Sequence, residues 1–261
     1  MNSIKNLFEF DKKVALVLGG SGYIGSQITS ALLEINCKVI ILDRKKPKIK
    51  SKKLKFINFD VNQTNKSQLI LNKLLKLNPK INYYVNASYP RTKSWNKCSF
   101  KSSNVNYYLE NVNIHLNSFI HTTKIMSDYF VRNKIKGKIV NLSSIYGSVA
   151  QNKELYKNTN MKESLPYPII KGGINMMTKQ FASYYGSYGI RINSVSPGGV
   201  IDKNLKKKYP TKFIKRYESI VPLKRFANPR EVALSIIFLL SDASSYITGE
   251  NLKVDGGWTI I

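Results

Sequence analysis

The sequence predicts an α/β protein in which helices cover both faces of a parallel sheet. Two observations support this fold class. Short apolar, β-rich runs alternate with helical stretches along the 261-residue chain. These runs are nearly continuous rather than alternating in polarity, as expected for strands that are buried on both faces of a sheet.

Seven apolar runs are the expected strands, at residues 14–18, 38–42, 54–59, 81–86, 138–142, 190–195 and 252–254. A helix is expected to start at Asn228, an N-cap that is followed by Pro229 and by the capping-box residue Glu231. Another helix is expected to begin near Tyr167. No internal repeat, linker or break in composition divides the chain, so we expect residues 1–261 to form one domain.

The composition narrows the classes of function. The only cysteines are Cys37 and Cys98, and the only histidines are His115 and His121. Because they lack metal-ligand spacing, we expect no disulfide framework and no metal site. No apolar run approaches the ~20 residues that span a bilayer. These features predict a cytoplasmic protein with no membrane partner.

The formal net charge of +27 is unusual. Such a charge attracts nucleic acids and other polyanions. The lysines are spread along the whole chain, however, whereas a nucleic-acid footprint clusters on one element. We therefore interpret the charge as a compositional bias and expect no nucleic-acid partner.

The first expected strand runs into a glycine-rich turn, Gly19-Gly20-Ser21-Gly22-Tyr23-Ile24-Gly25, and then into a helical stretch. Glycines in this context allow a tight turn and a close approach to a pyrophosphate, and the helix N-terminus supplies N–H donors. Asp43 ends the second expected strand, where a carboxylate hydrogen-bonds ribose hydroxyls and repels a 2′-phosphate. This favours NAD, although the cations Arg44, Lys45 and Lys46 follow at once and leave NADP open.

Tyr167 and Lys171 are four residues apart and therefore lie on one face of the expected helix. An ammonium beside a phenol favours the phenolate and lowers the pKa of the tyrosine. A tyrosine tuned in this way exchanges a proton with a reacting oxygen. The pair gains significance from the glycine turn and from Ser144, which lies at an upstream strand end.

At this point the chain resembles the short-chain dehydrogenase/reductase superfamily over nearly its whole length. The resemblance rests on motifs in a fixed order: the glycine turn, Asp60-Val61, Asn86-Ala87-Ser88, Asn141 to Ser144, Tyr167 with Lys171, Ser196 to Gly199, and Asp255-Gly256-Gly257. It implies a single-domain Rossmann fold with a doubly wound, seven-stranded parallel sheet. It also implies a nicotinamide cofactor, hydride transfer and a homotetramer or homodimer.

The resemblance assigns roles to individual residues. Tyr167 looks like the general acid/base, Lys171 like its pKa partner and a ribose ligand, and Ser144 like the residue that hydrogen-bonds the substrate oxygen. The implied cofactor-binding residues are Gly19, Ser21, Gly22, Tyr23, Ile24, Gly25, Asp43, Asp60, Val61, Asn86, Ala87, Pro197, Gly198 and Val200, together with Tyr167 and Lys171.

The chain departs from the superfamily pattern at four places. Tyr23 and Ser88 each stand where the pattern has glycine. His115 stands where the pattern has an asparagine that steadies a water near the lysine, so we expect it either to hold that water or to pack between helices. Ser144 and Tyr167 are unusually far apart, and we expect the extra residues 149–165 to bulge over the active site.

The segments Asn86 to Trp95 and Ser144 to Gly147, with the long insert, resemble oxidoreductases of flagellin and surface-glycan modification. Those proteins are thought to act on sugar or sugar-nucleotide intermediates, so we expect such a substrate here. Arg91 is the expected anchor of an anionic group on it, because its guanidinium binds carboxylate or phosphate through two hydrogen bonds. Two alternatives stay open: a 3-oxoacyl-carrier-protein reductase, and a dinucleotide sensor without catalysis.

Overall fold

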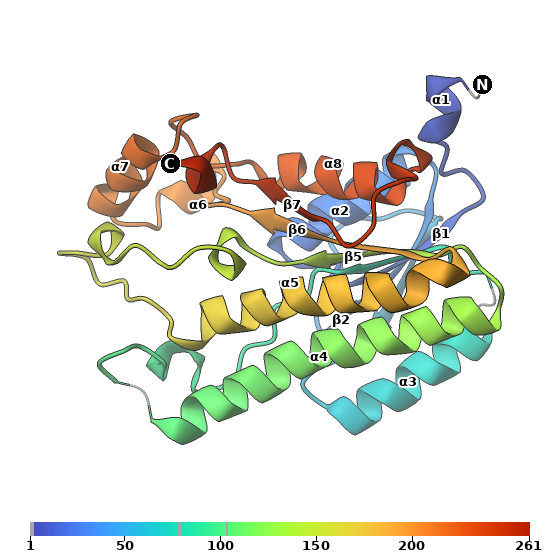
Figure 1. The fold of residues 1–261 in the computed structure, drawn as a ribbon, viewed down its shortest axis with the longest axis horizontal. Helices are drawn as coiled ribbons and strands as arrows, with labels where there is room; N and C mark the ends of the chain where they lie inside the picture. The colour runs from blue at the N-terminus through green and yellow to red at the C-terminus, as the bar shows by residue number, and fades with distance from the viewer. Residues whose placement is uncertain (1–2, 78–79, 103) are drawn as a thin grey trace.

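The computed structural model describes residues 3–77, 80–102 and 104–261, and within these ranges seven strands form one sheet (Figure 1). The strands are β1 Val14–Leu18, β2 Lys38–Asp43, β3 Leu54–Asn58, β4 Tyr83–Asn86, β5 Lys138–Leu142, β6 Arg191–Pro197 and β7 Asn251–Val254. All pairs are parallel, in the order β3-β2-β1-β4-β5-β6-β7. The predicted doubly wound seven-stranded sheet is confirmed, with some strand ends shifted by a residue or two.

Helices cover both faces of this sheet (Figure 1). One face carries α3 Thr64–Leu77, α4 Val105–Arg132 and α5 Pro166–Tyr185, and the other carries α2 Tyr23–Glu34 and α8 Pro229–Leu240. The shorter helices are α1 Ile4–Leu7, α6 Lys203–Lys206 and α7 Thr211–Ile220. Helix α8 begins as predicted, because Asn228 and Glu231 form a reciprocal capping box.

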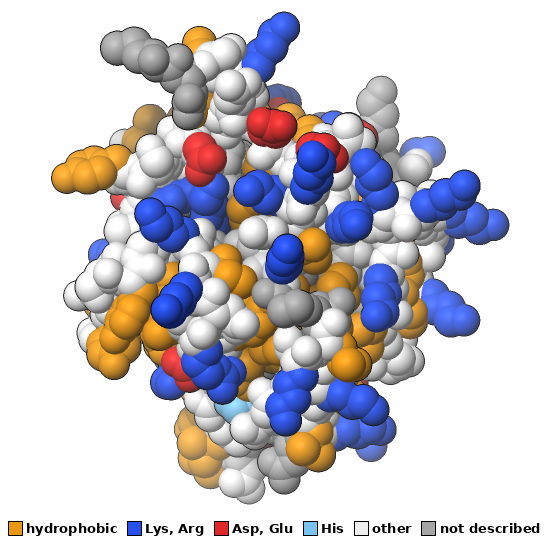
Figure 2. All heavy atoms as spheres, turned by 90° about the vertical axis from the view of Figure 1, so that its right-hand side faces the viewer, with side chains coloured by type: hydrophobic (Ala, Val, Ile, Leu, Met, Phe, Trp, Pro, Cys, Tyr) orange, Lys and Arg blue, Asp and Glu red, His pale blue; other side chains and the backbone are white. Residues whose placement is uncertain are grey.

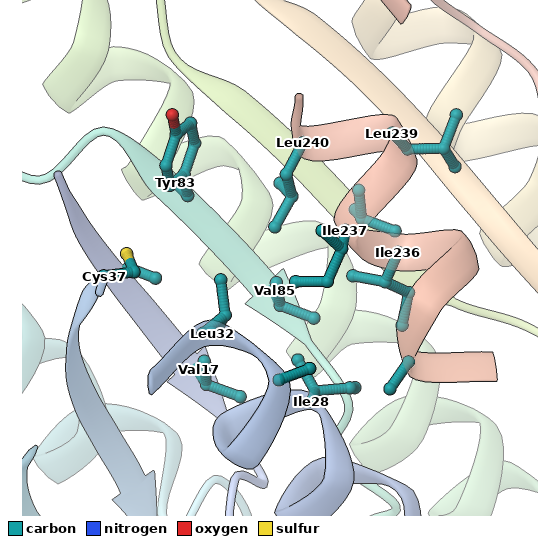
Figure 3. Close-up of a cluster of buried hydrophobic side chains, with 14 of the residues drawn as sticks. Val17, Ile28, Leu32, Cys37, Tyr83, Val85, Ile236, Ile237, Leu239 and Leu240 are labelled. Carbon is teal, nitrogen blue, oxygen red and sulfur yellow. The ribbon is translucent and has the colours of Figure 1, made fainter. Parts of the chain in front are cut away.

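Successive side chains of each strand point to opposite faces, and this divides the core into two layers. Val17 of β1 belongs to a buried cluster with Leu32 of α2 and Ile236 of α8 (Figure 3). Its neighbour Leu16 belongs to a second cluster on the other face, with Phe130 of α4. Packing on both faces explains why the strands are apolar throughout, and it fixes the positions of their ends.

The strand order reverses between β1 and β4, since β1 lies between β2 and β4. Leu18 at the end of β1 pairs with Leu42 of β2 and with Asn86 of β4. The segments that follow these three strands therefore leave the sheet side by side. Open α/β sheets bind ligands in the crevice at such a reversal.

Charged side chains on the face at the right of Figure 1 are mostly basic. Among the side chains coloured in Figure 2, lysines and arginines are scattered over this face between uncharged and apolar groups. Among the described residues, no helix has both the length and the apolar content to cross a bilayer. The same part of the chain contains no group of three or more His, Cys, Asp or Glu residues placed to hold a metal ion.

Candidate active site

A cleft of about 660 Å³ opens at the carboxyl ends of the central strands. It brings together most of the residues that the sequence singled out. These are Gly19, Gly22, Tyr23, Ile24, Gly25, Asp43, Asp60, Val61, Ala87, Arg91, Ser144, Tyr167, Lys171, Pro197, Gly198 and Val200. Three other predicted residues, Ser21, Asn86 and His115, do not line it.

The glycine turn places the N-terminus of α2 at this cleft. Gly19 has a φ of +78°, and a Cβ there would lie 2.6 Å from the carbonyl oxygen of Ala87. A Cβ on Gly25 would lie 2.0 Å from the carbonyl oxygen of Gly19. Glycine is needed at both positions. Since the N-cap, Gly22, has no side chain to cap the helix, the first N–H groups of α2 suit a dinucleotide pyrophosphate.

Asp43 is held by backbone donors at the end of β2. Its Oδ2 accepts a hydrogen bond from Ser21 N at 3.0 Å, and its Oδ1 accepts one from Lys45 N at 3.0 Å. Each carboxylate oxygen retains acceptor capacity for a ligand hydroxyl. Ser21 therefore supports the site through its backbone. Arg44 and Lys45 also line the cleft, so this end of it carries both signs of charge.

Asn86 supports the cleft from behind. It is fully buried, its Nδ2 donates to Thr122 Oγ1 at 3.2 Å, and its Oδ1 accepts from Ser88 N at 3.1 Å. These bonds fix the turn after β4, which presents Ala87 at the cleft wall. The Asn86 side chain therefore supports the turn that borders the cleft, and its direct contact with the cofactor stays a prediction.

Ser144, Tyr167 and Lys171 meet at the cleft from two elements. Ser144 follows β5, whereas Tyr167 and Lys171 lie one turn apart near the start of α5. Lys171 Nζ donates a hydrogen bond to Leu142 O at 2.9 Å and lies 5.7 Å from the centre of the Tyr167 ring. This bond ties the start of α5 to the end of β5, so the three side chains keep a fixed relation.

Burial dominates the electrostatics of this part of the cleft. Burial raises the pKa of Tyr167, while a hydrogen bond with Ser144 and the charge of Arg91 lower it. Burial also lowers the pKa of Lys171 to about 7. The predicted lowering of the Tyr167 pKa by Lys171 is therefore wrong, because desolvation of the phenolate outweighs the favourable interactions. In this structure Ser144 and Arg91 are the groups that favour the phenolate.

His115 lies on α4 among aromatic rings and is only 1% exposed. Its ring centre is 5.4 Å from that of Tyr89, 5.7 Å from that of Trp95 and 5.7 Å from that of Phe119. Burial, and secondarily the charge of Lys171, hold the pKa of His115 well below its usual value. The imidazole is therefore neutral, and it packs among these rings with neither of its buried nitrogens hydrogen-bonded to a described residue. A water-holding role stays a prediction.

Arg91 lies at the mouth of the cleft against an aromatic ring. Its guanidinium carbon is 4.7 Å from the centre of the Tyr89 ring, a cation–π contact. Tyr89 also meets Trp95 and Tyr167 edge-on, at 5.3 Å and 6.0 Å between ring centres. Sequence reasoning found Arg91 but gave no role to Tyr89 or Trp95. The signal was their occurrence on either side of Arg91 after a strand end.

The insert between Ser144 and Tyr167 lies beside the cleft. Its 3₁₀ turn, Lys153–Leu155, packs near α7, and the Tyr156 ring stacks on Phe213 with 5.9 Å between centres. Within the described chain, no residue of 149–165 lines the cleft. Apolar side chains of the insert pack with α7, yet Tyr156 also lies close enough to Tyr167 to raise its pKa, so the predicted bulge over the active site stays a prediction.

A glycine turn that admits a dinucleotide, and a partly buried tyrosine beside a buried lysine in the same cleft, are typical of nicotinamide-dependent oxidoreductases. A family model described as enoyl-(acyl carrier protein) reductase matches residues 21–259. The chain belongs to this family and hence to the short-chain dehydrogenases/reductases, as predicted. It is an NAD(P)-dependent oxidoreductase of small molecules.

Two related proteins differ in the share of this chain that they match. The chain is 29% identical to the post-translational flagellin modification protein A of Campylobacter coli over 258 residues, 95% of this chain and 98% of that one. It is 36% identical to the 3-oxoacyl-[acyl-carrier-protein] reductase of Thermotoga maritima over 149 residues, 57% of this chain and 56% of that one. Thus the second similarity spans only about half of each chain.

A solved structure also matches the fold over its full length. The short-chain dehydrogenase of Leptospira borgpetersenii, crystallised with bound NAD+, has a TM-score of 0.87 and 30% sequence identity to this chain. The match covers 99% of this chain and 97% of that one. The insert and the helices around the cleft therefore belong to an architecture found in a whole related enzyme.

Proposed function

We propose that this chain transfers hydride between a nicotinamide cofactor and a hydroxyl or keto group of a sugar or sugar-nucleotide precursor of a surface glycan. The observation that carries the proposal is that Arg91 lines the same cleft as Ser144, Tyr167 and Lys171. A guanidinium at the cleft mouth suits an anionic substrate, since it binds carboxylate or phosphate through paired hydrogen bonds.

The side chains of the protein handle the proton and the substrate oxygen. When bound, the nicotinamide supplies or accepts the hydride. Tyr167 exchanges a proton with the substrate oxygen, and Ser144 hydrogen-bonds that oxygen. Lys171 lies beside the phenol and offers a donor for a ribose hydroxyl. Arg91 lowers the pKa of Tyr167 by its charge and so assists whenever Tyr167 gives up its proton.

We propose NAD as the preferred cofactor. The Asp43 carboxylate is held in place by two backbone N–H groups, so a 2′-phosphate would meet a fixed like charge. Arg44 and Lys45 are exposed, and solvent screens their attraction for phosphate. In the same proposal, Asp60 and Val61 contact the adenine end. Pro197, Gly198 and Val200 lie against the nicotinamide end.

The sugar substrate is supported by the relative that matches the chain over its full length, a flagellin modification protein. The cleft adds a physical argument. Tyr89 and Tyr209 line the cleft together with Arg91, so the cleft offers a substrate both apolar ring surface and a positive charge. Aromatic faces and a guanidinium together suit a sugar that carries a phosphate or carboxylate.

A 3-oxoacyl-carrier-protein reductase is the second candidate. The description of the matching family and the partial similarity to the Thermotoga maritima reductase favour it. The basic surface would also suit an acidic carrier protein. A non-catalytic sensor is less well supported, because Ser144, Tyr167 and Lys171 are all present at the cleft.

A substrate screen that follows cofactor absorbance separates these functions. The panel contains sugar nucleotides and acidic sugars on one side and acyl thioesters on the other, each with NAD and NADP in the matching redox state. Tyr167→Phe serves as the blank for every compound. Turnover of an anionic sugar supports the leading proposal, and turnover of acyl thioesters alone replaces it with the second. Cofactor binding without any turnover would favour the sensor.

We further propose that the chain forms a homodimer or homotetramer in the cytoplasm. Helices α4 and α5 pack together and expose apolar side chains, including Leu109, Ile169 and Met176. A second copy of the chain would bury such a surface. The free thiols of Cys37 and Cys98 fit a reducing compartment. Light scattering during size-exclusion chromatography tests the oligomer, and a monomer would contradict it.

A further inference from the structure

Tyr23 links two segments that are far apart in the sequence. It replaces a glycine of the superfamily pattern and is the first residue of α2. Its hydroxyl accepts a hydrogen bond from the backbone N–H of Asp202 at 2.6 Å. The glycine turn after β1 is thereby tied to the segment that follows β6. A glycine at this position would offer no such bond.

The bond falls at the start of α6. The side chain of Asp202 caps this helix, since its Oδ1 accepts from Leu205 N at 2.7 Å. The backbone N–H of Asp202 is thus held by Tyr23 while its carboxylate holds α6. One phenol therefore fixes both the position of the segment and the place where its helix begins.

The same segment is anchored to the body of the protein closer to β6. The N–H of Ala227 donates to Gly199 O at 2.9 Å, and the N–H of Ile201 donates to Ala227 O at 3.1 Å. The Tyr217 hydroxyl accepts a further bond from Gly199 N. Residues 199–201 thus form a fixed base, and Tyr23 holds the chain just beyond that base.

Both sides of this contact border the cleft. Tyr23 lines it from the glycine turn, while Val200 and Tyr209 line it from the segment after β6. The Tyr23 side chain is 40% exposed, so its ring is not locked into the core. The bond therefore spans an opening and can break without unpacking the fold.

We propose that Tyr23 is a positioning residue that latches residues 202–209 across the cleft and slows the release of the dinucleotide. The latch lies outside the proton-transfer residues. Removing it changes how long the cofactor stays bound, while the chemistry of the proposed Ser144, Tyr167 and Lys171 site is left intact.

The test uses Tyr23→Phe, which removes only the hydroxyl. Stopped-flow fluorescence of NADH should show a dissociation rate about three- to tenfold faster than wild type, the scale of one hydrogen bond, with little change in association. Limited trypsin digestion gives a readout that needs neither cofactor nor turnover. Lys206, Lys207 and Lys208 are exposed beside the latch, and cleavage there should accelerate in the variant.

Tyr246→Phe is the matched control, because it removes a phenolic hydroxyl from a fully exposed side chain that does not line the cleft, and it leaves the bond between Tyr23 and Asp202 intact. Its NADH release and its cleavage at residues 206–208 should match wild type. Unchanged release and cleavage in Tyr23→Phe would overturn the latch. Equal acceleration in Tyr246→Phe, or equal acceleration of cleavage at distant sites, would also overturn it, since either result indicates general loosening.

Discussion

The two ends of the cleft are built by different means. At the end formed by β1 and β2, backbone geometry does most of the positioning: Gly19 and Gly25 allow close contacts, and backbone N–H groups hold Asp43. At the other end, side-chain packing takes over. Tyr89 contacts Arg91, Trp95 and Tyr167 through its ring.

Aromatic packing also supports the segment after β6, where the Tyr217 hydroxyl accepts a hydrogen bond from Gly199 N. The Tyr217 ring stacks between Phe226 and Trp258, with centres 4.0 Å and 4.7 Å apart. This stack joins α7 to the C-terminal segment. The difference between the two ends teaches how one fold serves many substrates: the backbone-built end suits a cofactor common to the family, and the ring-built end is free to vary with the substrate.

The largest expected effect separates chemistry from binding. Tyr167→Phe removes the proposed proton donor and keeps the ring, so turnover should fall by about 10²- to 10⁴-fold. NADH affinity and the melting temperature should stay near wild type, because the cofactor end of the cleft is unchanged. Steady-state kinetics and NADH fluorescence titration measure both. Near-normal turnover would refute the proposed role of Tyr167.

A smaller effect should follow a change at the cofactor end. Asp43→Ala removes the carboxylate that opposes a 2′-phosphate and leaves Arg44 and Lys45 in place. The ratio of NADH to NADPH affinity should shift toward NADPH by about tenfold or more, the scale of one charge-assisted contact. Titration of both reduced cofactors against wild type and variant measures it. If the wild type already binds NADPH more tightly, the preference for NAD is wrong.

The smallest expected effect is on stability and comes from the buried amine of Lys171. Its pKa falls from 10.5 to about 7 on folding, so between these values the unfolded chain binds more protons than the folded one. Stability from this group therefore rises with pH across that window, and the burial penalty is complete below it.

Lys171→Met removes the amine and should raise the melting temperature near pH 6.5 by several degrees, since about 1 kcal/mol corresponds to ~2–4 °C at this size. The gain over wild type should shrink toward pH 9.5. Thermal melts without cofactor at both pH values measure the difference. A gain that does not depend on pH would show that the charge of the amine is not its cause.

The backbone-built end was largely predictable from the sequence. Glycine spacing and an acidic strand end are local patterns with direct geometric meaning, and the strands were apolar because both faces are buried. The catalytic candidates Ser144, Tyr167 and Lys171 were found through motif order, and the structure places them in one cleft. Their roles remain proposals.

The ring-built end was less predictable, because its contacts join segments that are distant in sequence. Nothing local to Tyr89 indicates that it meets Trp95 and Tyr167, and nothing local to Tyr156 indicates that it stacks on Phe213. The predicted lowering of the Tyr167 pKa was wrong for the same reason. Spacing predicts that Lys171 is near, but only the packed structure gives the burial that raises the pKa.

The central claim is that the ring-built end recognises an anionic substrate through Arg91, and one comparison tests it most directly. The Michaelis constant of Arg91→Ala is measured for an anionic sugar substrate from the screen and for a neutral analogue, beside wild type and Arg91→Lys. For the anionic substrate, Arg91→Ala should raise the Michaelis constant by about tenfold or more, which corresponds to ~1.4 kcal/mol. Arg91→Lys should give a Michaelis constant between those of wild type and Arg91→Ala. The Michaelis constant for the neutral analogue should not change, and the melting temperature of the variant should match that of wild type. Equal Michaelis constants for the anionic substrate in wild type and Arg91→Ala would contradict the claim.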